Sequence, residues 1–274
     1  MDEIIDLTVG FDQREAVAYH TFVQSVLENA SVPCRFMPLN TKSLKDYDET
    51  HTDGSNEFIY SRFLVPHLMN FKGWAIYVDG DMICVEDIKK LWDLRDRKYA
   101  VQVVQHDYET KVTKKYWGNK NENYPRKNWS SVVIWNCGHE KHKILSPNFI
   151  QNQTGSFLHR FHWLNDDEIG SIDKKWNWLA MEYEEKKEVN LIHYTIGTPC
   201  FKEYNDKPFS SYWKKSFWDS NPWVRSLSAE LRFSQVFWYS QPVEFFVQGA
   251  WALDSEYARL GEGFYPHQWK MGIS

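Results

Sequence analysis

A short apolar run that ends in two aspartates constrains the fold of this chain more than any other feature. Residues 75–78, Ala-Ile-Tyr-Val, are uncharged and rich in β-branched and aromatic side chains, which predicts a buried strand. Asp79-Gly80-Asp81 follows directly, and Gly80 allows a tight turn. If the strand ends at this turn, both carboxylates can converge at the carboxyl end of a strand, where open α/β sheets bind ligands. Because close carboxylates repel unless a cation or proton lies between them, the motif predicts a divalent metal site that bridges to phosphate; a polar loop capping the strand is the alternative.

Up to about residue 205, short apolar runs alternate with amphipathic segments. This alternation predicts an α/β fold with a single, mainly parallel, Rossmann-like sheet flanked by helices. Apolar side chains recur near a 3.6-residue period over residues 13–29, and acids begin residues 166–173, so both segments are predicted as helices. Further helices are predicted at 58–69 and 87–93, and strands at 4–10, 32–39, 75–78, 99–105, 129–137 and 189–194. Residues 107–128 are polar and are predicted as a loop or a mobile lid.

The character of the sequence changes at about residue 208. Trp213, Phe217 and Trp218 interleave there with lysines, and residues 227–260 contain helix-like amphipathic segments. We therefore divide the chain into an α/β domain, residues 1–207, and an aromatic-rich helical C-terminal extension, residues 208–274. The extension is expected to pack on the domain, to mediate homo-oligomerisation or to touch a membrane surface.

The composition argues against several classes of protein. The formal net charge of −5 is unfavourable for general nucleic-acid binding. The four cysteines lie far apart without a C-x-x-C pair, which favours reduced thiols in a cytosolic protein over a zinc site or a disulfide framework. No apolar run approaches the ~20 residues that span a bilayer, and the acidic start does not resemble a signal peptide. We expect a cytoplasmic location, with peripheral contact at the inner membrane face as the variant.

A histidine at the end of the strand predicted at 189–194 strengthens the metal hypothesis. His193 follows Val-Asn-Leu-Ile and precedes a turn that contains Gly197. Two carboxylates, one imidazole and phosphate oxygens form a donor set that suits Mn²⁺ or Mg²⁺. The sequence thus predicts Asp79, Asp81 and His193 as metal ligands, with a structural histidine at a sheet edge as the alternative.

Several short motifs follow one another in a characteristic order. They are Leu-Thr-Val-Gly-Phe-Asp at 7–12, Tyr60-Ser61-Arg62, Tyr77-Val78-Asp79-Gly80-Asp81, Leu91-Trp92-Asp93, Asn-Asp-Asp-Glu-Ile at 165–169, Trp176-Asn177-Trp178 and Ile192-His193-Tyr194. Over residues 4–205 this ordered set resembles the family 8 glycosyltransferases, of the glycogenin and lipopolysaccharide galactosyltransferase type. The resemblance implies a GT-A fold and metal-dependent transfer of a sugar, with retention of configuration, from a UDP-sugar to a glycan, lipid-linked or polysaccharide acceptor.

The resemblance also implies roles for individual residues. Asp12 falls where the family's aspartate contacts the uracil, Arg62 where its arginine reaches the donor, and Lys202 is the candidate for its phosphate-binding lysine. Asp166 and Asp167 are the catalytic candidates, because a carboxylate near the anomeric carbon can stabilise an oxocarbenium-like state. The complete set predicted to bind the donor is Thr8, Gly10, Phe11, Asp12, Arg62, Asp79, Gly80, Gly197 and Lys202.

Three positions depart from the family pattern. Trp129 stands where many members have an asparagine that holds the sugar, and Asp167 replaces a glutamine that faces the anomeric carbon. The spacing from His193 to Lys202 also differs. We expect the choice of donor sugar to depend on Trp129 and Asp167.

Two other classes of protein remain open at the level of sequence. Haloacid-dehalogenase-type phosphatases also place D-x-D after an apolar strand, with the first aspartate as nucleophile. Their motif continues differently from Met82-Ile83 and does not lie this far inside a chain. A non-catalytic sugar- or nucleotide-binding protein is the second alternative, against which the intact Asp79, Asp81 and His193 argue.

Overall fold

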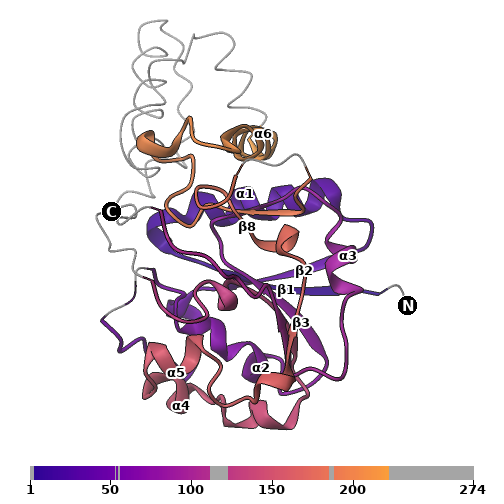
Figure 1. The fold of residues 1–274 in the computed structure, drawn as a ribbon, viewed down its shortest axis with the longest axis vertical. Coiled ribbons are helices and arrows are strands. Elements are labelled where there is room, and N and C mark those ends of the chain that lie inside the picture. The colour runs from indigo at the N-terminus through magenta and orange to yellow at the C-terminus, as the bar shows by residue number, and fades with distance from the viewer. Residues whose placement is uncertain (1–2, 53, 55, 112–122, 185–187, 222–274) are drawn as a thin grey trace, which may run out of the picture. The chain divides into compact units, whose positions relative to one another are not determined.

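In the computed structural model, a six-stranded sheet carries helices on both faces (Figure 1). The structure describes residues 3–52, 54, 56–111, 123–184 and 188–221. The strand order is β2-β1-β3-β6-β5-β7, and β6 alone runs antiparallel to its neighbours. The prediction of a mainly parallel sheet is confirmed. The strands are β1 (Ile5–Gly10), β2 (Cys34–Leu39), β3 (Trp74–Val78), β5 (Val101–Val103), β6 (Val132–Asn136) and β7 (Ile169–Ser171).

The two faces of the sheet bury alternate side chains of the same strands. Ile76 and Val78 point into one hydrophobic core, and Ala75 and Tyr77 point into the other. Figure 1 shows α1 and α3 over the first face, and α2, α4 and α5 over the second. Burial on both sides explains why the strands are almost continuously apolar. The helices are α1 (Ala16–Asn29), α2 (Val65–Leu68), α3 (Ile88–Trp92), α4 (Pro147–Gln151) and α5 (Gly155–His159).

A second sheet of three strands, ordered β4-β9-β8, was not part of the sequence prediction. It forms because the chain turns at Gly80 and pairs again elsewhere, with β4 antiparallel to β9. Ile83 and Ile192 of this sheet pack with Trp213 in a third hydrophobic core. The elements are β4 (Met82–Cys84), β8 (Trp178–Leu179), β9 (Leu191–His193) and α6 (Ser210–Ser220).

The helix predicted over 166–173 is wrong. Its acids form a single 3-10 turn, Asp166–Glu168, closed by a capping box between Asn165 and Glu168. Ile169 to Ser171 then pairs in parallel with β5, and burial of Ile169 in this sheet outweighs the local helix signal.

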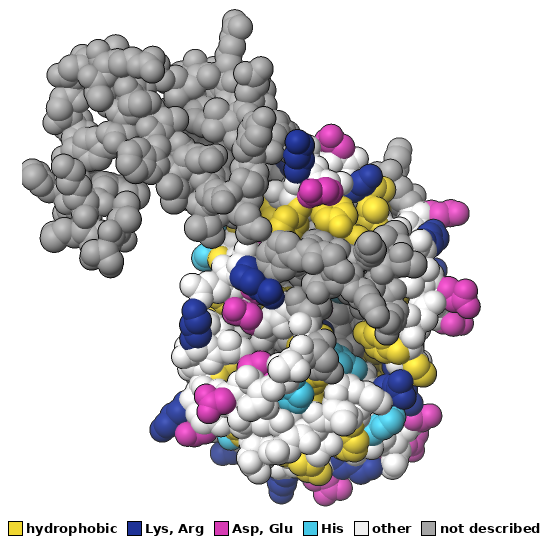
Figure 2. Space-filling model, turned by 90° about the vertical axis from the view of Figure 1, so that its left-hand side faces the viewer, with side chains coloured by type: hydrophobic (Ala, Val, Ile, Leu, Met, Phe, Trp, Pro, Cys, Tyr) yellow, Lys and Arg dark blue, Asp and Glu magenta, His cyan; other side chains and the backbone are white. Residues whose placement is uncertain are grey.

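The first part of the predicted C-terminal extension is helical. Helix α6 carries Trp213, which is buried in the third core, while residues 222–274 lie outside the described residues. Among the described residues, no helix has the length and hydrophobicity needed to cross a bilayer. On the face shown in Figure 2, acidic and basic side chains are interspersed.

Gly80 is required because the backbone of β1 approaches the turn closely. A Cβ atom at this position would collide with the carbonyl oxygen of Gly10. We expect Gly80→Ala to lower the free energy of unfolding by about 2 kcal/mol, the usual cost of overpacking against an unyielding neighbour. Gly138→Ala is the matched control, since its nearest neighbours would lie at ordinary contact distances of 3.8–3.9 Å. Urea denaturation measures both, and equal stabilities of the two variants would contradict this account.

Candidate functional site

The acidic pair lies where the two sheets meet. β3 ends at Val78 and β4 begins at Met82, so Asp79 and Asp81 flank the turn at Gly80, as predicted. Met82 is paired with His193 across the small sheet, and the amide of Tyr194 donates to the Asp81 carbonyl at 3.0 Å. Pairing of β4 with β9 therefore brings the histidine beside both aspartates.

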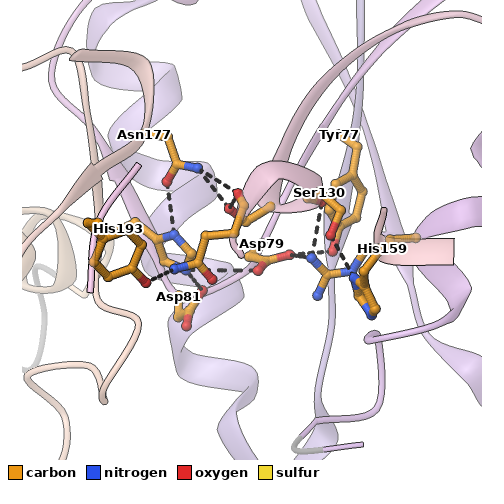
Figure 3. A network of polar contacts seen from close by, with 11 residues as sticks. Tyr77, Asp79, Asp81, Ser130, His159, Asn177 and His193 are labelled. Carbon is orange, nitrogen blue, oxygen red and sulfur yellow. Dashed lines mark hydrogen bonds and ion pairs between the residues drawn. The ribbon is translucent and has the colours of Figure 1, made fainter. Parts of the chain in front are cut away.

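The structure brings the three predicted metal ligands together (Figure 3). His193 Nε2 lies 3.3 Å from Asp81 Oδ1 and 3.8 Å from Asp79 Oδ2. One ligand atom from each residue falls within a group 4.8 Å across, and all three residues are buried. Oxygen and imidazole ligands at this spacing suit a divalent cation.

Arg62 neutralises one side of this cluster. Its buried guanidinium lies 2.8 Å from Asp79 Oδ1 and donates to the Ser130 carbonyl at 3.1 Å. The Tyr77 hydroxyl also donates to Asp79 Oδ1, at 2.6 Å. Asp79 therefore uses one oxygen for protein contacts, while its second oxygen faces His193.

The charges of the cluster favour a bound cation. Burial raises the pKa of the Asp79 carboxyl; the Arg62 cation opposes this effect, and the nearby Asp81 carboxylate adds to it. A single guanidinium does not balance two buried carboxylates, so the ionised pair needs further positive charge. The residues present thus fit a hard divalent ion.

A pocket with a cavity volume of about 80 Å³ opens over these residues. Because a water needs about 10–15 Å³ of such volume, the pocket has room for several water-sized groups. Its lining residues are Asn56, Ile59, Arg62, Asp79, Asp81, Tyr124, Asn128, Ser130, His159, His193 and Thr195.

The Ser130–His159 pair of this pocket was missed by the sequence analysis. The Ser130 hydroxyl and His159 Nδ1 are 2.7 Å apart (Figure 3). Burial, assisted by the Arg62 cation, lowers the pKa of His159 well below its ordinary value, so the ring is neutral. Neither residue lies in a recognisable motif, and only the packing of α5 against the main sheet brings His159 to the pocket.

The residues predicted on the first strand do not line the pocket. The Thr8 hydroxyl donates to the Ile76 carbonyl at 3.1 Å and so links β1 to β3. Gly10 provides space for the Phe58 ring, and Phe11 packs edge-to-face on Tyr19. For Thr8 and Gly10, these contacts are structural, because both residues are enclosed by the packed sheet.

Asp12 is buried but already fully engaged. Its carboxylate accepts from the Arg14 amide and from two nitrogens of the Arg14 guanidinium, at 2.5–2.9 Å, and from the Glu57 amide at 3.2 Å. These four bonds use the roughly four lone-pair positions of a carboxylate. A uracil contact through Asp12 would therefore require the Arg14 side chain to break its bonds to this carboxylate and move away.

The other predicted residues also lie away from the pocket lining. Asp166 is exposed and lies 2.6 Å from Arg126, and Asp167 is exposed on the same 3-10 turn. Gly197 accommodates the Tyr204 ring, and Lys202 is exposed at the start of a short 3-10 helix, Lys202–Tyr204.

Trp129 does not face the pocket in place of the family's asparagine. Its indole N–H donates to the His106 carbonyl at 3.0 Å, and Arg126 covers its ring. The neighbouring Ser130 lines the pocket instead, together with Asn128, which adopts a left-handed conformation with φ of 62°.

Glu15 is a buried acid that the sequence analysis also missed. It accepts a 2.6 Å hydrogen bond from Thr198, in the segment that follows His193. Burial, with repulsion from Asp81, raises its pKa from an ordinary 4.5 to about 8, and the Thr198 bond offsets this only in part. Glu15 is therefore neutral at pH 7 and adds no further charge beside the aspartates.

This shift predicts a pH-dependent effect of Glu15→Gln on the metal-free protein. The folded state holds the Glu15 proton that the unfolded chain releases, so wild type loses up to about 1.4 kcal/mol of stability per pH unit above the ordinary pKa of glutamate. The loss is complete above about pH 8. The difference in free energy of unfolding between Glu15→Gln and wild type should therefore shift by about 2 kcal/mol or more in favour of the variant as the pH rises from 5 to 8. Urea denaturation measures this gain, and the exposed Glu109→Gln, which should show none, is the control.

Comparisons with known proteins give the family. Residues 11–139 match the model described as Glycosyl transferase family 8. Protein CDI of Arabidopsis thaliana is 44% identical over 214 residues, which are 75% of this chain and 83% of that protein. This chain belongs to glycosyl transferase family 8. The predicted family and enzyme class, a glycosyltransferase, are thereby confirmed, and the family decides against both alternatives.

Solved structures agree with this family at the level of the fold. The glycosyltransferase GlyE of Streptococcus pneumoniae TIGR4, in its apo form, has a TM-score of 0.54 at 12% identity. The bifunctional glycosyltransferase WbbM has a TM-score of 0.51 at 14% identity. Each match covers 82% of this chain, which spans 64% of GlyE and 52% of WbbM. The predicted GT-A fold is confirmed.

Proposed function

We propose that this family 8 enzyme is a metal-dependent, retaining glycosyltransferase that uses a UDP-sugar donor and a glycan or lipopolysaccharide-like acceptor. The observation that carries the proposal is the convergence of Asp79, Asp81 and His193 beside Arg62 in one pocket. Retention, the uridine base and the kind of acceptor follow from the family resemblance.

Transfer of a sugar leaves a nucleoside diphosphate that gains negative charge as the bond to the anomeric carbon breaks. Asp79, Asp81 and His193 would hold Mn²⁺ or Mg²⁺, which stabilises a diphosphate leaving group when bound. Arg62 is fixed by Asp79 and the Ser130 carbonyl, so its positive charge is already oriented toward the pocket. The cation and Arg62 together oppose the charge of the leaving group.

The sugar itself would occupy the same pocket as Arg62. Asn128, Ser130 and Tyr124 offer amide and hydroxyl groups there, which suit sugar hydroxyls. Asp166 and Asp167 remain the candidates for the carboxylate near the anomeric carbon. Their role requires them to approach the pocket when the donor binds, since they are exposed in this structure.

The experiment is a thermal-shift and calorimetry series with UDP, GDP and ADP, each with Mn²⁺, with Mg²⁺ or with EDTA. We expect UDP with Mn²⁺ to raise the melting temperature most, and EDTA to remove the effect. A panel of UDP-sugars then identifies the donor by hydrolysis to UDP. Undiminished UDP binding in EDTA would contradict the metal role, and preference for GDP or ADP would contradict the uridine donor.

A further inference from the structure

A chain of polar contacts leads from His193 through the buried Asn177 to Ser131 and Asn128 (Figure 3). His193 Nδ1 lies 2.9 Å from Asn177 Oδ1. Asn177 ends the 3-10 helix η8 (Lys174–Asn177), directly before β8, which pairs in parallel with β9 and so sets Asn177 beside His193. Both side chains are buried, with exposures of 0% and 2%, so water does not satisfy either group.

The orientation of the Asn177 amide follows from its other contacts. Its nitrogen lies 2.7 Å from Ser131 Oγ and 3.3 Å from the Asn128 carbonyl oxygen. Ser131 donates its only hydrogen to that same carbonyl at 2.7 Å, so Ser131 Oγ can only accept from Asn177. Two acceptors face this end of the amide, which must therefore be the NH₂ group, and the amide oxygen must face His193.

The amide oxygen in turn determines where the imidazole carries its hydrogen. An amide oxygen only accepts, so at 2.9 Å Nδ1 must be the N–H. The tautomer with its hydrogen on Nε2 alone would set two lone pairs against each other in a buried site. Nε2 is then the ring atom left to face Asp79 and Asp81.

We propose that Asn177 is a positioning residue that holds the hydrogen of His193 on Nδ1 and so keeps Nε2 available as a metal ligand. The inference rests on the proposed function for the identity of the site, but its tautomer step does not depend on turnover. Without Asn177, the nearby carboxylates would draw the hydrogen to Nε2, the atom that the cation needs. Removal of a group that orients a metal-bound histidine in this way typically lowers metal affinity 10–100-fold.

The test compares three variants of the full chain. Asn177→Leu removes the acceptor at similar size. Asn177→Asp keeps an acceptor for Nδ1 but loses the donors toward Ser131 and Asn128. Ser131→Ala weakens only the far side of the network and leaves the contact to His193. Nitrogen-15 NMR of histidine-labelled, metal-free protein reports the tautomer of the neutral ring, with His193→Asn to assign its signal, and calorimetry measures Mn²⁺ affinity.

We expect the Nδ1–H tautomer in wild type, Asn177→Asp and Ser131→Ala, and a shift toward Nε2–H in Asn177→Leu. Mn²⁺ affinity should fall about 10–100-fold in Asn177→Leu and stay within a few-fold of wild type in Asn177→Asp. A merely structural Asn177 would make the aspartate variant as weak as the leucine variant, which overturns the proposal, as would an Nε2–H wild type. If wild type binds neither Mn²⁺ nor Mg²⁺, with or without UDP, the proposed function fails instead, and the NMR result still decides the tautomer.

Discussion

Asp81→Asn is expected to abolish metal-dependent transfer without unfolding the protein. The amide removes the ligand charge that faces His193 Nε2 at 3.3 Å. A catalytic metal supplies several kcal/mol of charge stabilisation, so a loss of about 4 kcal/mol corresponds to a fall in kcat on the order of 10³-fold. Stability of the metal-free protein should hold or rise, because the substitution removes repulsion toward the Asp79 carboxylate.

Steady-state kinetics with the donor found in the nucleotide screen, and urea denaturation in EDTA, measure the two effects. Asp93→Asn is the control, since this exposed aspartate forms an i,i+4 pair with Lys89. Activity of Asp81→Asn within tenfold of wild type, or full activity in EDTA, would disprove the metal role of Asp81.

Arg62→Met is expected to destabilise the metal-free protein by about 3 kcal/mol, because removal of one partner leaves a buried charge unpaired. Asp79, the partner, is 6% exposed, and burial already raises its pKa. Because its pKa is raised, the Asp79 carboxyl takes up a proton more readily as the pH falls, so the loss should become smaller toward low pH. Added Mn²⁺ should recover part of the lost stability.

The double variant Arg62→Met/Asp79→Asn separates charge from packing. It should be less destabilised than the sum of the two single variants, because neither charge remains buried alone. Arg35→Met is the matched control, since Arg35 forms a comparable bond to Asp6 at the surface and should cost less than about 1 kcal/mol. An additive double variant would show that Arg62 and Asp79 do not act as a pair.

The sequence predicted that Asp79, Asp81 and His193 converge, and the structure shows that they do, because the signals for this cluster are local. An apolar strand, a glycine turn and two acids lie within a few residues of each other, and the turn must leave the carboxylates near the end of β3. His193 was found in the same way, at the end of a short apolar run. The helix prediction from local signals failed at 166–173, where acids typical of a helix start precede a strand, β7, that pairs in parallel with β5.

The remaining site residues depend on contacts between distant segments. In the sequence Asn177 stands out only as part of a Trp-Asn motif. Its contact with His193 depends on the pairing of β8 with β9. His159 and Ser130 meet across 29 residues of chain, and Thr198 reaches Glu15 across 183. Such pairs leave no periodicity or spacing that a sequence pattern could reveal.

The sequence by itself determined the family, the mainly parallel sheet and the candidate ligands Asp79, Asp81 and His193, which the structure brings together, because hydrophobic periodicity and short motifs act within a few residues. Only the tertiary structure decided which polar groups are buried, and with which partners. In the folded chain Asp12 pairs with Arg14, the Trp129 indole bonds to the His106 carbonyl away from the pocket, and His193 bonds to Asn177. The physical reason is that a buried polar group needs a hydrogen-bond partner, and that partner often comes from a distant segment that only packing brings close.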